Sequence, residues 1–203
     1  MKLYRRRMIK AFVLSCFVLL LLFPVVACAD QANIFIYHRF GESRYPSTNI
    51  DLELFASHMQ YLQDSGKLVL PLPEIIKHLQ SGRTIPPGTV ALTVDDAFDS
   101  FLEKAMPILR KHRFPVTLFV NTDGVGGRGY LDWEQIRQLE REGVTIGNHT
   151  ATHDYLLERK EGESREAWRK RVRGDILKAQ DAFARELGFR PDLFAYPCLL
   201  YTS

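Results

Sequence analysis

Short apolar runs alternate along the sequence with longer amphipathic stretches, and this alternation limits the folds open to the chain. Each short run is rich in β-branched and aromatic residues and is bounded by glycine, proline or polar residues, as strands are. The longer stretches carry apolar residues three and four positions apart, which is typical of helices. The pattern predicts an α/β fold of βα units around a parallel sheet or barrel. The predicted strands are 34–37, 68–70, 89–94, 116–120, 144–147 and 193–196, and the predicted helices are 54–63, 73–80, 98–111, 133–142 and 164–187.

Local signals place the ends of these helices. Asp132 precedes one helical stretch, where a side chain that accepts hydrogen bonds from the first turn is favoured. Pro107 lies inside the stretch 98–111, where it removes a backbone donor, so we expect that helix to begin near Leu102. Glycines follow four of the stretches, where a left-handed residue is favoured: Gly66, Gly82, Gly143 and Gly188.

Residues 1–29 have the organisation of a secretory signal peptide, with basic residues, then an apolar run over 11–26, then small residues. Ala27-Cys28-Ala29 fits a cleavage site that leaves Asp30 as the first residue of the domain 30–203. Two alternatives remain open: Cys28 as a lipidated first residue, and a retained membrane anchor. All three predict export to the periplasm or cell envelope, and the two alternatives add a membrane anchor.

The charge distribution argues against a nucleic-acid partner. The formal net charge is +3, but five of the 27 basic residues precede the first acidic residue, Asp30. The remainder therefore carries 22 basic against 24 acidic residues, a net charge of −2. Because phosphate binding needs clustered lysine and arginine, we expect no nucleic acid among the partners.

Polar residues follow two of the predicted strands at the edge where parallel sheets collect functional groups. The strand 89–94 runs into Asp95 and Asp96, and the strand 144–147 runs into a segment that contains His149 and His153. Adjacent carboxylates are costly unless a cation neutralises them or one serves as a base. Two histidines four residues apart can reach one ion. Together these residues predict a metal site with two imidazoles, one carboxylate and a spare carboxylate, as in catalytic zinc sites.

These motifs carry a resemblance to a known family. The segment 93–97 (TVDDA) resembles the T-F-D-D-G motif of polysaccharide deacetylases, carbohydrate esterase family 4, and 149–153 (HTATH) matches that family's H-[ST]-x-x-H motif. The stretches 37–40, 86–90, 114–120, 131–133 and 143–148 are also similar to family members. The resemblance implies an incomplete (β/α)7-type barrel, here without its C-terminal strands. It also implies hydrolysis of N-acetyl groups on an N-acetylglucosamine polymer, with release of acetate.

The resemblance assigns roles to the motif residues. Asp95 would be the catalytic base, and Asp96, His149 and His153 would hold Zn²⁺, with Co²⁺ or Ni²⁺ as substitutes. The substrate would be poly-N-acetylglucosamine, peptidoglycan or a chitin-type polymer, the first being favoured by similarity near the N-terminus.

Three further residues are candidates for oxyanion or substrate contacts. The family's oxyanion donor lies in the segment that matches 194–198, which makes the backbone amide of Cys198 the candidate here. Tyr196 in the same segment is a candidate substrate contact. His38 would lie on the same rim, where a substrate contact and a purely structural role are equally open.

The sequence departs from the family pattern in two places. Ala97 stands where the family has glycine, which matters if the backbone there is left-handed. After Cys198 the expected Asp/Trp segment and the Leu-x-His general acid do not follow, so we expect a truncated copy of a longer protein. Two other functions therefore stay open: a carbohydrate-binding protein without catalysis, and a metallohydrolase such as a peptide amidase.

Overall fold

The computed structural model describes residues 31–197, and the elements in this range alternate as the sequence predicts. The predictions for residues 1–30, including Cys28, and for Cys198 lie outside the described residues. Within residues 31–197, no helix is both long and apolar enough to cross a membrane. The strands are β1 (Ala32–Tyr37), β2 (Arg39–Phe40), β3 (Asn49–Ile50), β4 (Leu68–Val69), β5 (Thr89–Asp95), β6 (Thr117–Val120) and β7 (Thr145–Asn148). The helices are α2 (Leu52–Asp64), α3 (Leu72–Ser81), η1 (Phe101–Ala105), α4 (Met106–His112), α5 (Trp133–Arg141) and α6 (Arg165–Leu187).

The main sheet is parallel, with the strand order β1-β5-β6-β7 and with β4 beside the first residues of β5. This confirms the predicted α/β fold. The register pairs Asp95 with Phe119 and Val120 with Asn148, so the carboxyl ends of β5, β6 and β7 meet at one edge. In the part of the chain that the structure describes, β1 and β7 end the strand order and do not pair with each other, as expected of an incomplete barrel.

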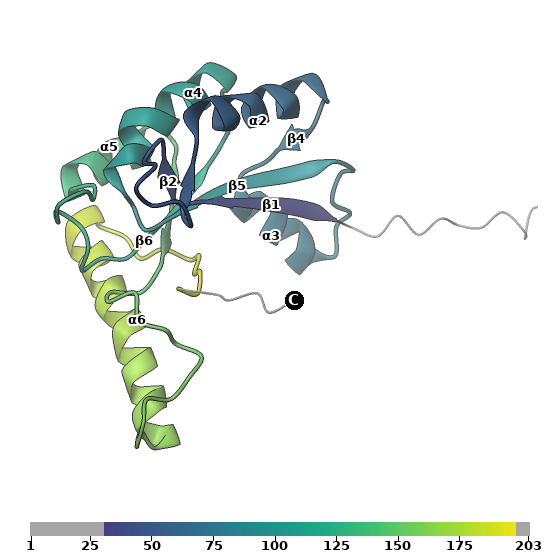
Figure 1. The fold of residues 1–203 in the computed structure, drawn as a ribbon. Helices are drawn as coiled ribbons and strands as arrows, with labels where there is room; N and C mark the ends of the chain where they lie inside the picture. The colour runs from purple at the N-terminus through teal and green to yellow at the C-terminus, as the bar shows by residue number, and fades with distance from the viewer. Residues whose placement is uncertain (1–30, 198–203) are drawn as a thin grey trace, which may run out of the picture. The chain divides into compact units, whose positions relative to one another are not determined.

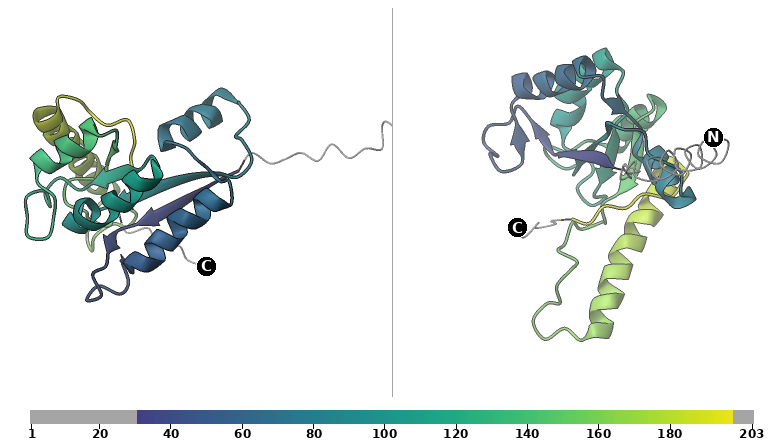
Figure 2. Two further views of the ribbon diagram at one scale, coloured as in Figure 1. Left: turned by 90° about the horizontal axis from the view of Figure 1, so that it is seen from above. Right: turned by 90° about the vertical axis from the view of Figure 1, so that its right-hand side faces the viewer.

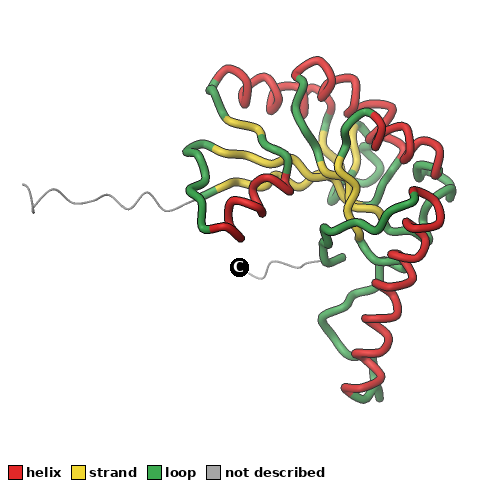
Figure 3. Tube along the Cα trace, turned by 180° about the vertical axis from the view of Figure 1, so that it is seen from behind, coloured by secondary structure: helices red, strands yellow, loops and turns green. Residues whose placement is uncertain are grey.

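Helices cover the two faces of the sheet unequally (Figures 1 and 2). Val90, Leu92 and Val94 of β5 belong to the large core cluster that includes residues of α2, α4 and α5. Ala91, which points to the other face, packs in a smaller cluster with residues of α3. Most helices therefore lie along the outer side of the curved sheet, as Figure 3 shows. Beside the polar strand ends, Ile34 and Ile36 of β1 are 48% and 47% exposed, whereas β5 is buried up to Val94.

One predicted strand is missing from the structure, and one predicted helix begins where expected but with a π-helical turn. The strand predicted over 193–196 is reduced to a single bridge between Asn148 and Phe194. Two backbone bonds to Asn148 hold this segment against β7, and Pro197 offers no further donor. The helix predicted to begin near Leu102 starts at Phe101 with a π-helical turn, in which the Met106 N–H bonds to the Phe101 carbonyl. Pro107 then lies in the first turn of α4, where its missing N–H costs little.

The predicted helix ends are confirmed where side chains or glycine fix them. The Asp132 carboxylate accepts from the Gln135 N–H at 2.8 Å, and the Gln135 side chain accepts from the Asp132 N–H at 2.8 Å, which closes a capping box on α5. Gly82 and Gly188 end α3 and α6 with φ of 64° and 79°. Both glycines adopt the left-handed conformation that other residues enter only at a cost.

Candidate metal centre

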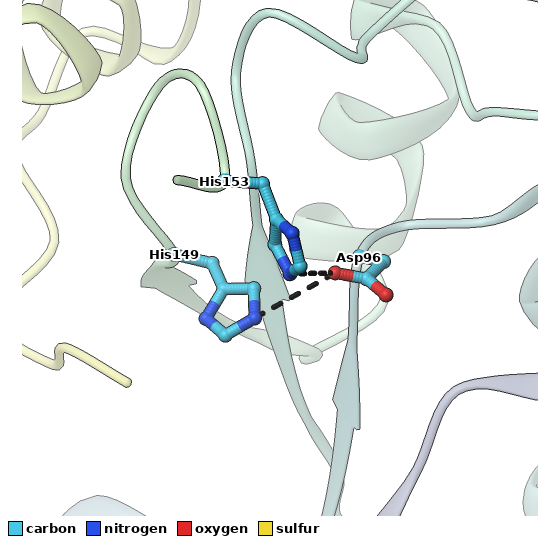
Figure 4. A group of neighbouring side chains, drawn as sticks. All are labelled: Asp96, His149 and His153. Carbon is cyan, nitrogen blue, oxygen red and sulfur yellow. Dashed lines mark ion pairs between the residues drawn. The ribbon is translucent and has the colours of Figure 1, made fainter. Parts of the chain in front are cut away.

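The polar residues predicted at the strand ends lie together in the structure. Asp95 is the last residue of β5. Asp96 follows it, while His149 and His153 follow β7 (Figure 4). The Oδ1 of Asp96 lies 2.9 Å from the Nε2 of His153 and 3.6 Å from the Nε2 of His149. One ligand atom from each of the three residues falls within 4.8 Å of the others. The arrangement offers one carboxylate oxygen and two imidazole nitrogens to a single ion.

The loop after β7 is folded so that both imidazoles face Asp96. The Asn148 side chain accepts from the Thr150 N–H at 2.7 Å, and the Thr150 hydroxyl accepts from the His153 N–H at 3.0 Å. These two bonds close short turns, and they carry the chain through left-handed φ values of 67° at Thr150 and 59° at His153. A left-handed conformation at a residue other than glycine costs about 1–3 kcal/mol. The loop is thus held in a strained shape that serves the site.

The turn after β5 is strained in the same way. Asp96 has φ 76° and Ala97 has φ 56°, and Ala97 is completely buried. The glycine that the family motif has at this position would enter this conformation at little cost. The departure noted in the sequence therefore falls at a position where the backbone is left-handed. Backbone hydrogen bonds on both residues hold this turn, from the Asp96 N–H to the Phe119 carbonyl at 3.0 Å and from the Leu131 N–H to the Ala97 carbonyl at 2.9 Å.

His149 is oriented by the segment that follows α6. Its Nδ1 donates to the Ala195 carbonyl at 3.0 Å, which leaves the lone pair of Nε2 directed at Asp96. Burial lowers the pKa of His149 to about 4, so the imidazole is neutral at neutral pH. Histidines that bind metals commonly donate their other N–H to a carbonyl in this way. The Ala195 carbonyl carries no sequence signal, because any residue supplies one.

Asp96 and His153 form an ion pair. Burial alone would raise the pKa of Asp96, but the hydrogen bond from His153 and the charges of the neighbouring histidines outweigh it and lower that pKa. The same hydrogen bond raises the pKa of His153. A cation at this position would take the place of the His153 proton as the partner of the Asp96 carboxylate.

The carboxylate of Asp95 lies beside the three donors without bonding to them. Its Oδ2 is 3.9 Å from the Nε2 of His149 and 3.9 Å from the Nε2 of His38, beyond hydrogen-bonding distance in both cases. Burial, followed by the negative charge of Asp96, raises the pKa of Asp95 to about 7. Two adjacent carboxylates with pKa values shifted in opposite directions are typical of a base next to a ligand.

A cavity of about 500 Å³ opens beside Asp95 on the inner face of the sheet. His38 and Tyr196, the two predicted substrate contacts, both line it, and the structure thus brings them to the rim of the site. Its other walls are mostly apolar side chains: Ile34, Ile36, Leu72, Phe119, Phe194 and Ala195. The sequence did not predict this cavity, because it is formed by residues from five separate segments.

Comparison with known proteins identifies the family. The family model described as polysaccharide deacetylase matches residues 82–203, more than half of the chain. The chain belongs to the polysaccharide deacetylase family. A protein of Bacillus subtilis (strain 168) named as a polysaccharide deacetylase, YxkH, is 27% identical over 120 residues, which are 59% of this chain and 42% of that protein. A poly-β-1,6-N-acetyl-D-glucosamine N-deacetylase of Staphylococcus aureus is 25% identical over 175 residues, 83% of this chain and 60% of that protein.

Solved structures of deacetylases share the fold of this family member. IcaB from Ammonifex degensii superposes with a TM-score of 0.73 at 26% identity, over 86% of this chain and 77% of that one. A de-N-acetylase from Aggregatibacter actinomycetemcomitans gives a TM-score of 0.73 at 19% identity, over 85% of this chain and 81% of that one, and supports the fold alone. The chain spans about half the length of the curated relatives it matches, 42% and 60% in the two cases.

Proposed function

We propose that this family member is a metal-dependent N-deacetylase that hydrolyses N-acetyl groups of an N-acetylglucosamine polymer to acetate and free amine. The observation that supports this most is the position of Asp95, a carboxylate with a pKa near neutrality beside two imidazoles and a second carboxylate. The similarity to an enzyme named for poly-β-1,6-N-acetyl-D-glucosamine favours that polymer over peptidoglycan or chitin-type substrates.

The donor set fits a divalent metal ion of the zinc type. Asp96, His149 and His153 offer one oxygen and two nitrogens, and zinc sites with three protein ligands leave a position open for chemistry. Such donors also suit Co²⁺ and Ni²⁺. A bound ion supplies Lewis-acid chemistry, because it polarises a carbonyl and lowers the pKa of water. The fixed orientation of His149 and its neutral state at neutral pH support this assignment.

The residues beside the three metal ligands have roles in the reaction that follow from their surroundings. Asp95 accepts a proton from the attacking water at its carboxylate, and burial raises its pKa above the usual value for an aspartate, which suits a general base. The neighbouring cavity receives the acyl group between mostly apolar walls, while His38 and Tyr196 contact the sugar. We retain the backbone amide of Cys198 as the oxyanion donor within this proposal.

Substitution of Asp95 tests the proposed function. Asp95→Asn keeps the size of the side chain but removes the base, so acetate release from N-acetylglucosamine oligomers should fall by about 10²–10⁴-fold. Metal binding should stay within about twofold, since Asp95 is not one of the three ligands. The matched control is Asp64→Asn, at an exposed position on α2, which should release acetate like the parent chain.

Other results would favour the remaining functions. Unchanged acetate release by Asp95→Asn would contradict the role of Asp95. Binding of the oligomers by the parent chain without any acetate release would favour a carbohydrate-binding protein. Release of amines from peptides, with none from acetylated sugars, would favour a peptide amidase.

We further propose that the chain is exported, since residues 1–29 combine a basic segment, an apolar run and a cleavage motif. The mass of the chain recovered from an exporting bacterial host tests this. A mature chain that begins at Asp30 is the expected result. A lipidated Cys28 would indicate membrane anchoring, and an unprocessed chain retained in the cytoplasm would contradict export.

A further inference from the structure

We propose that Asp175 of α6 is a positioning residue for the metal centre, because its carboxylate holds the loop that carries His149 and His153. This inference rests on the proposed metal site. It does not depend on which bond the site hydrolyses.

The carboxylate of Asp175 binds one residue of the loop with both of its oxygens. Oδ1 accepts from the Thr152 N–H at 3.0 Å, and Oδ2 accepts from the Thr152 hydroxyl at 3.0 Å. The two residues are 23 positions apart, so this contact joins helix α6 to the loop after β7. Thr152 directly precedes His153, and a shift of its backbone would move the imidazole.

The same turn of α6 holds the start of the loop. The Asn148 side chain donates to the carbonyl of Ile176, the residue after Asp175, at 3.2 Å. Asn148 directly precedes His149. Residues 175 and 176 thus contact the residue that precedes each of the two histidines. Through these contacts, one helix fixes the positions of both histidines.

The carboxylate of Asp175 has no close ionic partner among residues 31–197, although the charges of His153 and Arg171 act on it over a longer distance. Asp175 is 9% exposed, and its carboxylate forms no ion pair with any basic group in the range 31–197. A buried carboxylate without an ionic partner costs free energy unless hydrogen bonds compensate it. Both hydrogen bonds that Asp175 accepts come from Thr152, so this contact compensates part of the cost of burying the carboxylate.

The loop needs such support because its backbone is strained. Thr150 and His153, on either side of Thr152, have left-handed φ values of 67° and 59°. In the segment after β6, the N–H groups of Thr122 and Asp123 bond to the carbonyls of Thr150 and Ala151 at 3.1 and 2.9 Å. The loop is therefore held between the segment after β6 and helix α6. Removal of the contact to α6 should let Thr152 relax and disturb the alignment of His153.

Titration of the metal-free, full-length chain with Co²⁺ tests this inference, since the visible absorption of Co²⁺ reports both affinity and ligand geometry. Asp175→Asn keeps the shape of the side chain but loses one of its two acceptors. It should weaken Co²⁺ binding by about 10–100-fold, the usual effect of a partner that orients a metal ligand. Thr152→Val should weaken binding in the same sense, and Thr152→Ser, which keeps both donors, should restore it.

Asp181→Asn serves as the matched control. Asp181 lies on the same helix, but it is exposed and pairs with Arg190 at 2.6 Å, so its substitution should leave the Co²⁺ affinity and spectrum unchanged. A purely structural role for Asp175 would lower the melting temperature and leave the spectrum of the saturated, folded variant unchanged. If Asp175 positions the metal ligands, its substitution should also change the absorption spectrum of the Co²⁺-saturated variant.

The outcomes separate this inference from the proposed function. Co²⁺ binding by Asp175→Asn within twofold of the parent, with the same spectrum, would overturn the inference and leave the deacetylase proposal intact. If Asp175→Asn does not fold, equal affinity in Thr152→Val and Thr152→Ser would overturn it. Absence of Co²⁺ binding by the parent chain would overturn both the inference and the metal site of the proposed function.

Discussion

At the scale of single residues, two adjacent carboxylates of the site have pKa values that are shifted in opposite directions. Burial and the charge of Asp96 raise the pKa of Asp95 to about 7, whereas the bond from His153 and the nearby histidine charges outweigh burial at Asp96 and lower its pKa. Both carboxylates lie near the Nε2 of His149, at 3.9 Å from Asp95 and 3.6 Å from Asp96, but only Asp96 pairs closely with His153, at 2.9 Å. One carboxylate is thereby suited to accept a proton and the other to bind a cation.

The raised pKa of Asp95 predicts how the stability of the metal-free chain depends on pH. The folded state holds the Asp95 proton more tightly than the unfolded chain does. The contribution of this group is therefore fully present below about pH 4 and is lost as the pH rises to about 7. Asp95→Asn does not titrate, so it should become more stable relative to the parent by up to about 4 kcal/mol over this range.

Urea unfolding of both chains with a chelator present, at about pH 4 and at about pH 8, measures this difference. The exposed Asp64→Asn variant should show no such change between the two pH values. A free-energy difference between Asp95→Asn and the parent that is independent of pH would show that Asp95 ionises normally in the folded state.

The sequence could predict that four polar residues lie together, because strand ends and four-residue spacing are visible in it. Asp95, Asp96, His149 and His153 follow directly from these signals. The contacts that orient them could not be predicted in the same way. The Ala195 carbonyl on His149 is a backbone group, and Asp175 reaches Thr152 only because α6 packs beside the loop.

At the scale of elements, local signals predicted the helices better than the last strand. Asp132 and Gln135 fix the start of α5 by bonds within one turn, so a short piece of sequence contains the whole cause. Whether a segment forms a strand depends on its hydrogen bonds with the neighbouring strands of the sheet. Residues 193–196 have strand-like composition, but they pair with β7 through one bridge only, so the structure there is an extended segment.

Close packing between β6 and β7 predicts the effect of one substitution. A Cβ atom on Gly147 would lie 2.4 Å from two ring carbons of Phe119, the residue opposite it in the sheet. Gly147→Ala should therefore cost about 1–3 kcal/mol of stability, as overpacking in a core does. Gly174→Ala on the exposed side of α6 meets nothing within 4 Å and should instead gain up to about 1 kcal/mol.

Thermal unfolding of the two alanine variants and of the parent chain measures these changes in stability. Gly147→Ala should also weaken metal binding, since the Phe119 ring that must move lies 6.4 Å from the His149 ring. Equal stability of Gly147→Ala and Gly174→Ala would mean that β6 and β7 are not packed as described.

At the scale of the whole molecule, the fold brings together groups that are far apart in sequence. The parallel order β1-β5-β6-β7 sets His38, Asp95 and His149 at one edge of the sheet, although more than 50 residues separate each from the next. The alternation of strands and helices predicted this edge, and membership of the polysaccharide deacetylase family agrees with it. The cavity beside Asp95 could not be predicted, because the order of the strands and the path of residues 193–197 determine it.

X-ray absorption at the zinc edge of the zinc-loaded chain identifies the atoms that bind the metal, and so tests whether Asp96, His149 and His153 form the metal centre. We predict a shell of nitrogen and oxygen at about 2.0–2.1 Å, with the scattering of two imidazoles and no sulfur. The spectrum of His149→Ala should lose the contribution of one imidazole. A shell that contains sulfur at about 2.3 Å, or a spectrum that His149→Ala and His153→Ala both leave unchanged, would contradict a metal centre at Asp96, His149 and His153.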